Sequence, residues 1–94
     1  MKVTYTGEAV ADILEAITYL NERNPTATAK LDAEITACIE RLAAREFDGP
    51  VSRLRSGAVV RSWAVPPFRI YYQRQSDELL IVRVYHQARR PIAR

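Results

Sequence analysis

The dipeptide Asn24-Pro25 divides the first half of the chain into two segments that each carry a helical pattern of apolar residues. Before it, apolar side chains recur every three or four residues at Ala9, Ile13, Ile17 and Leu20. After it, the same spacing continues through Ala27, Leu31, Ile35, Ile39 and Leu42. Such spacing places the apolar side chains on one face of a helix. Proline disfavours helix in the residue before it and fits the first helical position, and asparagine caps a helix well. The sequence therefore predicts helices over about 7–23 and 25–45, joined as a tight hairpin.

The apolar pattern changes from helical spacing to alternation at Ala58. Alternation is typical of strands, and it predicts strands over 58–65, 68–73 and 79–85. Residues 2–6 alternate as well and predict a short first strand that must pair with this sheet. The segment 51–57 is expected to be a basic loop. The order β-α-α-β-β-β predicts an α+β fold in which a helical hairpin packs on one face of a small antiparallel sheet, with the apolar last strand in a central place.

The length of 94 residues predicts one domain that spans positions 1–94. One cysteine cannot form an internal disulfide, and no apolar run is long enough to span a membrane. The first residues lack the apolar segment of a signal peptide, so we expect a cytoplasmic protein without membrane contact. Cys38 is interpreted as an inert thiol of the core. A single histidine and a single cysteine favour no metal site, and no phosphate-binding glycine loop indicates a cofactor.

Charge is distributed unevenly along the chain. Residues 1–46 carry five basic and eight acidic side chains, whereas residues 47–94 carry nine arginines, no lysine and three acids. Arginine binds phosphates and carboxylates through two parallel hydrogen bonds. The basic second half therefore predicts an anionic partner, either nucleic acid or an acidic protein segment. The alternative is a solvated basic face that binds nothing.

The sheet face that does not cover the helices is expected to expose an arginine cluster. Strand alternation suggests that Arg61, Arg69 and Arg83 gather there beside Tyr71, where guanidinium groups could hold phosphates and the tyrosine ring could stack on a base. His86, at the end of the last strand, could move a proton near neutral pH. Together these groups would suffice for metal-independent RNA cleavage. The alternative is that His86 bonds locally to the backbone and that the tyrosines and Trp63 serve sheet packing.

Two stretches of the sequence resemble a known family. The first is the helical segment Asp12-Ile13…Ile17…Tyr19-Leu20…Asn24-Pro25, and the second is the closing run from Phe68-Arg69-Ile70-Tyr71-Tyr72 to Ile81-Val82-Arg83-Val84-Tyr85-His86-Gln87-Ala88-Arg89-Arg90-Pro91. Both resemble ParE-type proteins of the RelE/ParE toxin superfamily. The resemblance implies the toxin of a type II toxin–antitoxin pair, held inactive in a hetero-oligomer with its cognate antitoxin. It also implies that the antitoxin packs on the helical hairpin or on the sheet.

The superfamily has two mechanisms. RelE-like members cleave mRNA on the ribosome, whereas ParE-like members inhibit DNA gyrase. For a nuclease, the resemblance places Arg69 and Arg89 at catalytic arginines, His86 near a histidine acid or base, and Arg61 near a pair of lysines that this chain lacks. The chain also lacks a late tyrosine. These departures favour the ParE-like function, with the nuclease as one alternative and a non-toxic nucleic-acid-binding module as another.

Two further sets of residues are assigned to binding. Arg83, Arg90 and Tyr71 are expected to contact the cellular target, which is gyrase or, for a nuclease, the ribosome and its mRNA. Ile13, Ile17 and Leu20 are expected to contact the antitoxin, because a core this small leaves part of two apolar helix stripes uncovered. Val10 and Leu14 widen the first of these stripes.

Overall fold

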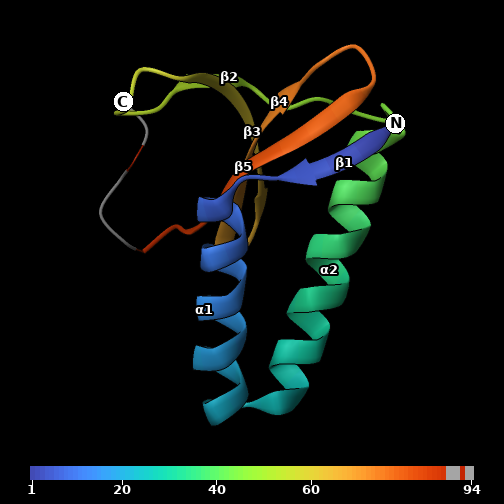
Figure 1. Ribbon diagram of the computed structural model, residues 1–94. Helices are drawn as coiled ribbons and strands as arrows, with labels where there is room; N and C mark the ends of the chain where they lie inside the picture. The colour runs from blue at the N-terminus through green and yellow to red at the C-terminus, as the bar shows by residue number, and fades with distance from the viewer. Residues whose placement is uncertain (89–91, 93–94) are drawn as a thin grey trace.

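The computed structural model describes residues 1–88 and 92. In that part of the chain the helices and strands follow one another as β1 (Lys2–Tyr5), α1 (Gly7–Arg23), α2 (Pro25–Ala43), β2 (Val51–Arg53), β3 (Val59–Val65), β4 (Phe68–Arg74) and β5 (Glu78–His86). The two helices lie on one face of the sheet, and the hairpin tip extends beyond the sheet (Figure 1). The predicted α+β fold is confirmed.

The described strands form one sheet in the order β1-β5-β4-β3-β2. All neighbours are antiparallel except β1, which pairs parallel to β5. The apolar strand β5 lies between β1 and β4, as predicted. One element is new, because β2 falls in the segment 51–57 that was expected to be a loop. Three residues with one serine and one arginine carry too little alternation to predict a strand, and pairing with β3 is what orders them.

Local capping explains where the helices begin. The Thr6 side chain accepts a hydrogen bond from the Ala9 N–H at 3.0 Å, and the Asn24 side chain accepts one from the Ala27 N–H at 3.1 Å. Both contacts satisfy backbone donors that have no partner within the helix. The second helix ends at Ala43, slightly before the predicted end, and Arg45 then adopts a φ of 60° that no helix continues.

The main core lies between the helices and the sheet. Fully buried side chains from both layers meet there, among them Leu42, Ile70, Tyr72, Leu79, Ile81 and Val84. Cys38 is buried in the same core, and burial raises the pKa of its thiol, although the charge of Arg41 opposes this. The far face of the sheet carries a second, smaller cluster of Leu54, Val60 and Tyr71, against which Ile92 packs.

A β-bulge in β5 breaks the alternation that the sequence predicts for this strand. Tyr71 lies opposite Arg83, but Tyr72 lies opposite Ile81, so Val82 is the extra residue. As a result Ile81 and Val84 both face the helices, although alternation assigned them to opposite faces. A bulge of one residue reverses the facing of every side chain beyond it. His86 therefore lies on the helix side of the sheet and Arg83 on the far side.

The link between α2 and β2 is fixed by Tyr72. Its buried hydroxyl donates to the Asp48 carboxylate and accepts the Gly49 N–H at 2.8 Å. A Cβ atom on Gly49 would lie 1.7 Å from the Ser62 carbonyl oxygen, so this position admits only glycine. The close approach of Gly49 to the Ser62 backbone places the link directly against β3.

Candidate functional site

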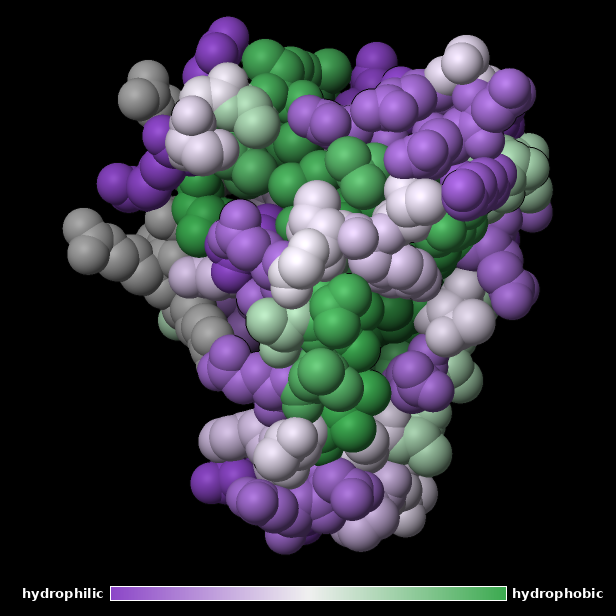
Figure 2. All heavy atoms as spheres, viewed as in Figure 1, coloured by the Kyte–Doolittle hydropathy of each residue, from purple (hydrophilic) through white to green (hydrophobic). Residues whose placement is uncertain are grey.

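An apolar groove runs between α1 and α2. Its volume is about 160 Å³, and Ile13, Ile17 and Leu20 line it from α1. Ile13 and Leu20 are half-buried against the core, whereas Ile17 is 37% exposed. Figure 2 shows hydrophobic side chains gathered along the line between the two helices, with hydrophilic ones beside them. The structure therefore leaves these three predicted side chains together and partly uncovered.

The exposed apolar surface continues onto the outer side of α1. Leu14 is 60% exposed, and Val10, which is 44% exposed, lies one turn before it on the same side of the helix. Large apolar side chains in one continuous area of a small protein mark a site of interaction. Sequence reasoning found Val10 and Leu14 only as a broadening of the stripe. The sequence does contain a signal for this surface, because the apolar stripe of α1 is wider than the one helix face that packs on the core.

The predicted cluster of Arg61, Arg69 and Arg83 is not formed. Arg61 lies opposite Tyr72 and so faces the helix side of the sheet, whereas Arg69 lies opposite Ala64 and Tyr85 on the far side. The Arg61 guanidinium donates to the Gly49 carbonyl at 2.8 Å and lies 3.6 Å from Asp48. The expectation of one shared arginine face is therefore wrong. Pairing across β3 and β4 decides the face, and alternation within one strand cannot.

Asp48 is an acid that Arg61 and Arg74 share on the helix side. Its carboxylate also lies 3.3 Å from the Arg74 guanidinium. Burial acts to raise the pKa of Asp48, but hydrogen bonds from Tyr72 and Arg74 and the charges of Arg74 and Arg61 outweigh it and lower the pKa. The Tyr72 hydroxyl shows the opposite shift, since burial and the bond to Asp48 raise its pKa. This network serves the fold.

Arg69 and Arg83 do share the far face with Tyr71 and Tyr85. Arg69 donates to the Ser62 hydroxyl at 3.0 Å, and Tyr71 is only 8% exposed within the second cluster. These side chains are in the predicted place, but packing and local hydrogen bonds already engage them. The alternative interpretation of Tyr71 as a packing residue fits its burial.

The Arg83 guanidinium turns from the far face toward α1. It donates to the two carboxylate oxygens of Asp12 at 2.7 and 2.9 Å and lies 3.2 Å from Glu8. The Asp12 carboxylate also accepts the Val84 N–H at 3.1 Å, where β1 no longer covers the edge of β5. The hydrogen bonds that Arg83 donates to Asp12 raise the pKa of Arg83 despite its partial burial. Arg83 thus joins α1 to β5, and its predicted contact with a cellular target has no structural support.

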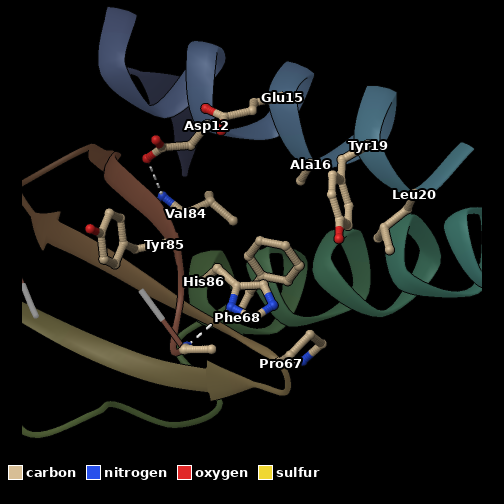
Figure 3. Close-up of a pocket in the computed structure, with 11 residues that line it drawn as sticks. Asp12, Glu15, Ala16, Tyr19, Leu20, Pro67, Phe68, Val84, Tyr85 and His86 are labelled. Atoms are coloured by element: carbon tan, nitrogen blue, oxygen red, sulfur yellow. Dashed lines mark hydrogen bonds between the residues drawn. The ribbon is translucent and has the colours of Figure 1, made fainter. Parts of the chain in front are cut away.

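His86 lines a pocket of about 300 Å³ between α1 and the end of β5, with Tyr19, Leu20 and Phe68 as neighbours (Figure 3). The imidazole lies edge-on to the Phe68 ring, with 5.0 Å between the ring centres. Its Nδ1 accepts the Ala88 N–H at 3.0 Å, which is the local backbone contact that the alternative interpretation describes. The sequence did not predict this pocket, because the bulge in β5 is what turns His86 toward the helices.

The residues assigned to RNA cleavage do not meet in the described part of the chain. His86 pairs with Phe68 and Arg61 with Tyr72, four residues farther along β4, which corresponds to about 13 Å of strand. Arg69 lies on the opposite face from both. Arg89 and Arg90 lie outside the described residues.

Residues 1–88 and 92 show neither a cluster of metal-binding side chains nor a membrane-spanning helix. No group of three histidine, cysteine, aspartate or glutamate side chains there could hold a metal ion. No helix in this range is both long and apolar enough to cross a membrane.

The fold and sequence were compared with known proteins. The family model described as "ParE toxin of type II toxin-antitoxin system, parDE" matches residues 3–91. A search of curated proteins gave no match. Among solved structures, a chain of the "Chromosomal ParDE TA system from P. aeruginosa" is similar with a TM-score of 0.72 and 21% identity, covering 92% of this chain and 95% of that one. At that identity the structural likeness shows the fold, and the family model, which spans nearly the whole sequence, shows the family. The chain belongs to the ParE toxin family of type II toxin–antitoxin systems.

Proposed function

We propose that this protein stops bacterial growth by binding a macromolecular target, DNA gyrase, and that a cognate antitoxin neutralises it by covering the groove between α1 and α2. The observation that carries the proposal is the match to the ParE toxin family over residues 3–91. Gyrase acts in the cytoplasm, so we place the protein there.

The arrangement of the arginines supports binding over RNA cleavage. A nuclease of the RelE type needs its arginines and its acid or base around one phosphate. Here Arg69 and His86 lie on opposite faces of the sheet, and Arg83 is held by Asp12. Growth arrest through RNA cleavage is therefore the weaker candidate.

The hairpin groove supports the antitoxin contact. An apolar segment laid along α1 would bury Ile17, which is 37% exposed, and Leu14, which is 60% exposed. Full burial of an exposed leucine or isoleucine side chain contributes about 1.5–3 kcal/mol. Ile17 and Leu14 are already partly buried, so each would contribute about half of that, and several such anchors together support binding. The antitoxin would thus bind mainly through apolar contacts.

The experiment expresses the protein in bacteria with and without the neighbouring gene. We expect growth arrest when the protein is expressed by itself and normal growth when the neighbouring gene is expressed with it. The purified protein should inhibit DNA supercoiling by gyrase, and the transcripts of the arrested cells should stay intact. Absence of growth arrest would refute the toxin, and cleaved transcripts with unaffected gyrase would refute the gyrase target.

A pair of variants tests the groove. Ile17→Glu places a charge in the groove and should weaken antitoxin binding by about 100-fold while toxicity persists. Ala33→Glu adds the same charge at an exposed position of α2 that does not line the groove, and should bind as the parent does. Equal affinity of both variants would show that the antitoxin binds elsewhere.

A further inference from the structure

We propose that the pocket between α1 and the end of β5 binds a small, fully alkylated ammonium ion that carries a hydroxyl group close to its nitrogen. This pocket, called the His86 pocket below, has a volume of about 300 Å³, and Glu15, Tyr19, Phe68 and His86 are among the residues that line it. It is distinct from the hairpin groove, and the proposal does not depend on gyrase, on the antitoxin or on toxicity.

Aromatic side chains from three elements line the His86 pocket. Tyr19 comes from α1, Phe68 is the first residue of β4, and His86 is the last residue of β5. The His86 and Phe68 rings lie nearly perpendicular, at 78° with 5.0 Å between their centres, and Tyr19 extends toward them from the helix (Figure 3). The faces of aromatic rings attract cations, and several rings around one space are a common site for an alkylated ammonium ion.

The Tyr19 ring already contacts one cation of the protein itself. The central carbon of the Arg23 guanidinium lies 3.8 Å from the centre of this ring. Arg23 does not line the pocket, and its charge is paired with Glu22 at 4.0 Å. Tyr19 is still 56% exposed, so its ring keeps surface that a second cation can contact from the pocket.

The charges around the pocket favour a cation over an anion. Among the described residues, the lining contains Asp12 and Glu15 but no lysine or arginine. Arg83 donates to the Asp12 carboxylate at 2.7 and 2.9 Å, and the Glu8 carboxylate lies 3.2 Å from the same guanidinium. In the described part of the chain, three carboxylates therefore surround one guanidinium at this end of the pocket. A bound anion would be repelled here, whereas a cation would be attracted.

His86 adds a hydrogen-bond donor without adding a charge. Its Nδ1 accepts the Ala88 N–H at 3.0 Å, so this nitrogen carries no proton and the neutral ring is protonated at Nε2. Nε2 lies on the side of the ring away from Ala88 and faces the pocket (Figure 3). Within residues 1–88 and 92 it has no hydrogen-bond partner. A donor beside the aromatic rings fits a hydroxyl oxygen held close to the ammonium group.

A fully alkylated ammonium ion fits the lining better than a primary one. A primary ammonium has three N–H donors, and each needs an acceptor. The Asp12 carboxylate already accepts hydrogen bonds from the Arg83 guanidinium and the Val84 N–H. Leu20 and Pro67 make another part of the wall apolar. An ion with methyl groups on its nitrogen needs no acceptor and packs these groups against that wall.

His86 is the only histidine of the chain, so the signals of its ring in nuclear magnetic resonance spectra report directly on the pocket. The probe is choline, titrated into the full chain, and we expect saturable shifts of these signals. Two analogues test the two features of the ligand. 3,3-Dimethylbutanol has the shape of choline without its charge and should bind about tenfold more weakly. Propyltrimethylammonium has a methyl in place of the hydroxyl group and should bind about threefold more weakly.

Variants of one exposed side chain test the aromatic contact. Tyr19→Ala removes one ring from the pocket and should weaken choline binding by about tenfold. Tyr19→Phe keeps the ring and should bind as the parent does. The matched control is Tyr5→Ala, which removes an exposed tyrosine that does not line this pocket and should also bind as the parent does. Circular dichroism confirms that each variant is folded.

Phosphocholine tests the source of the ammonium group, because lipid headgroups carry this group as a phosphate ester. We expect it to bind at least about tenfold more weakly than choline, since its phosphate approaches Asp12 and Glu15. Equal or tighter binding of phosphocholine would overturn the argument from charge, and equal binding of 3,3-dimethylbutanol would show an apolar contact only. No saturable shift with choline, or unchanged binding by Tyr19→Ala, would overturn the proposal. Failure of the growth assay leaves this result unaffected, so the two proposals can fail separately.

Discussion

Removal of the Asp12 carboxylate should loosen the joint between α1 and β5. Asp12→Ala deletes two charge-assisted hydrogen bonds from Arg83 and one hydrogen bond from the Val84 N–H. The Asp12 side chain is only 10% exposed and that of Arg83 21%, so water does not readily replace these contacts. An uncompensated buried charge costs about 3–5 kcal/mol. Because Arg83 retains Glu8 at 3.2 Å and some access to solvent, we expect about 2–4 kcal/mol.

This loss is large for a chain of 94 residues, whose total stability is on the order of 5–15 kcal/mol. Each kcal/mol corresponds to about 4–8 °C in Tm at this size, so Asp12→Ala should lower Tm by roughly 8–32 °C. Urea unfolding followed by far-ultraviolet circular dichroism measures the free energy, and thermal scans measure Tm.

Three comparison variants test the reasoning. Asp12→Asn keeps an acceptor for one donor but loses the charge, and should fall between the parent and Asp12→Ala. The double variant Asp12→Leu with Arg83→Leu removes both charges and should cost less than Asp12→Ala, because no charge is left unpaired. Glu22→Ala removes an exposed pair with Arg23 at 4.0 Å and should cost under about 0.5 kcal/mol. If Asp12→Ala costs no more than Glu22→Ala, the joint does not stabilise the fold.

Three further predictions follow from the core and the Asp48 network. Asp48 has a lowered pKa in the folded protein, so the stabilisation it provides is present above the unfolded pKa of about 4 and is lost as pH falls through the folded pKa. The free energy of unfolding of Asp48→Asn, measured in urea, should therefore fall less with acid than that of the parent. The difference should be under about 1 kcal/mol, because the carboxylate is 41% exposed. Gly49→Ala should destabilise by about 2–3 kcal/mol in urea unfolding because its Cβ meets the Ser62 carbonyl, whereas Gly7→Ala, which meets nothing within 4 Å, should not destabilise. Cys38 should react with a thiol reagent about 100-fold more slowly in the folded protein than in urea, since burial raises its pKa and shields it; equal rates would show that the core opens freely.

The helical hairpin could be predicted because its signals are local. The apolar spacing, the caps at Thr6 and Asn24 and the proline at the start of α2 all act within a few residues. These signals hold in any tertiary setting that buries the stripe, and the observed bounds of both helices agree closely with the predicted ones.

The face on which each arginine lies could not be predicted from the sequence, because it depends on pairing. Alternation within β3 puts Arg61 with Trp63, and alternation within β4 puts Arg69 with Tyr71. Which of these sets shares a face is decided by the register, and a shift of one residue would reverse the answer. The bulge between Tyr71 and Tyr72 adds a second such shift for β5. Neither feature leaves a local mark in the sequence.

The arginine-rich composition of the second half points to structure as much as to a partner. Arg61 bonds the Gly49 carbonyl, Arg74 bonds the Leu42 carbonyl at 2.8 Å, and Arg83 binds Asp12. Each of these guanidinium groups ties a loop or a helix to the sheet, so much of the positive charge already has an internal role. Binding energy for a large partner must then come mainly from the uncovered apolar side chains, such as Leu14 and Ile17.

The salt dependence of affinity distinguishes apolar from electrostatic recognition in one measurement. Binding driven by counterion release weakens steeply as salt rises, whereas apolar burial does not. The complex of this protein with its antitoxin should therefore keep its affinity within about tenfold between low and high salt. A steep salt dependence of the antitoxin complex would place its main contacts on the arginines and remove the hairpin groove as its principal site.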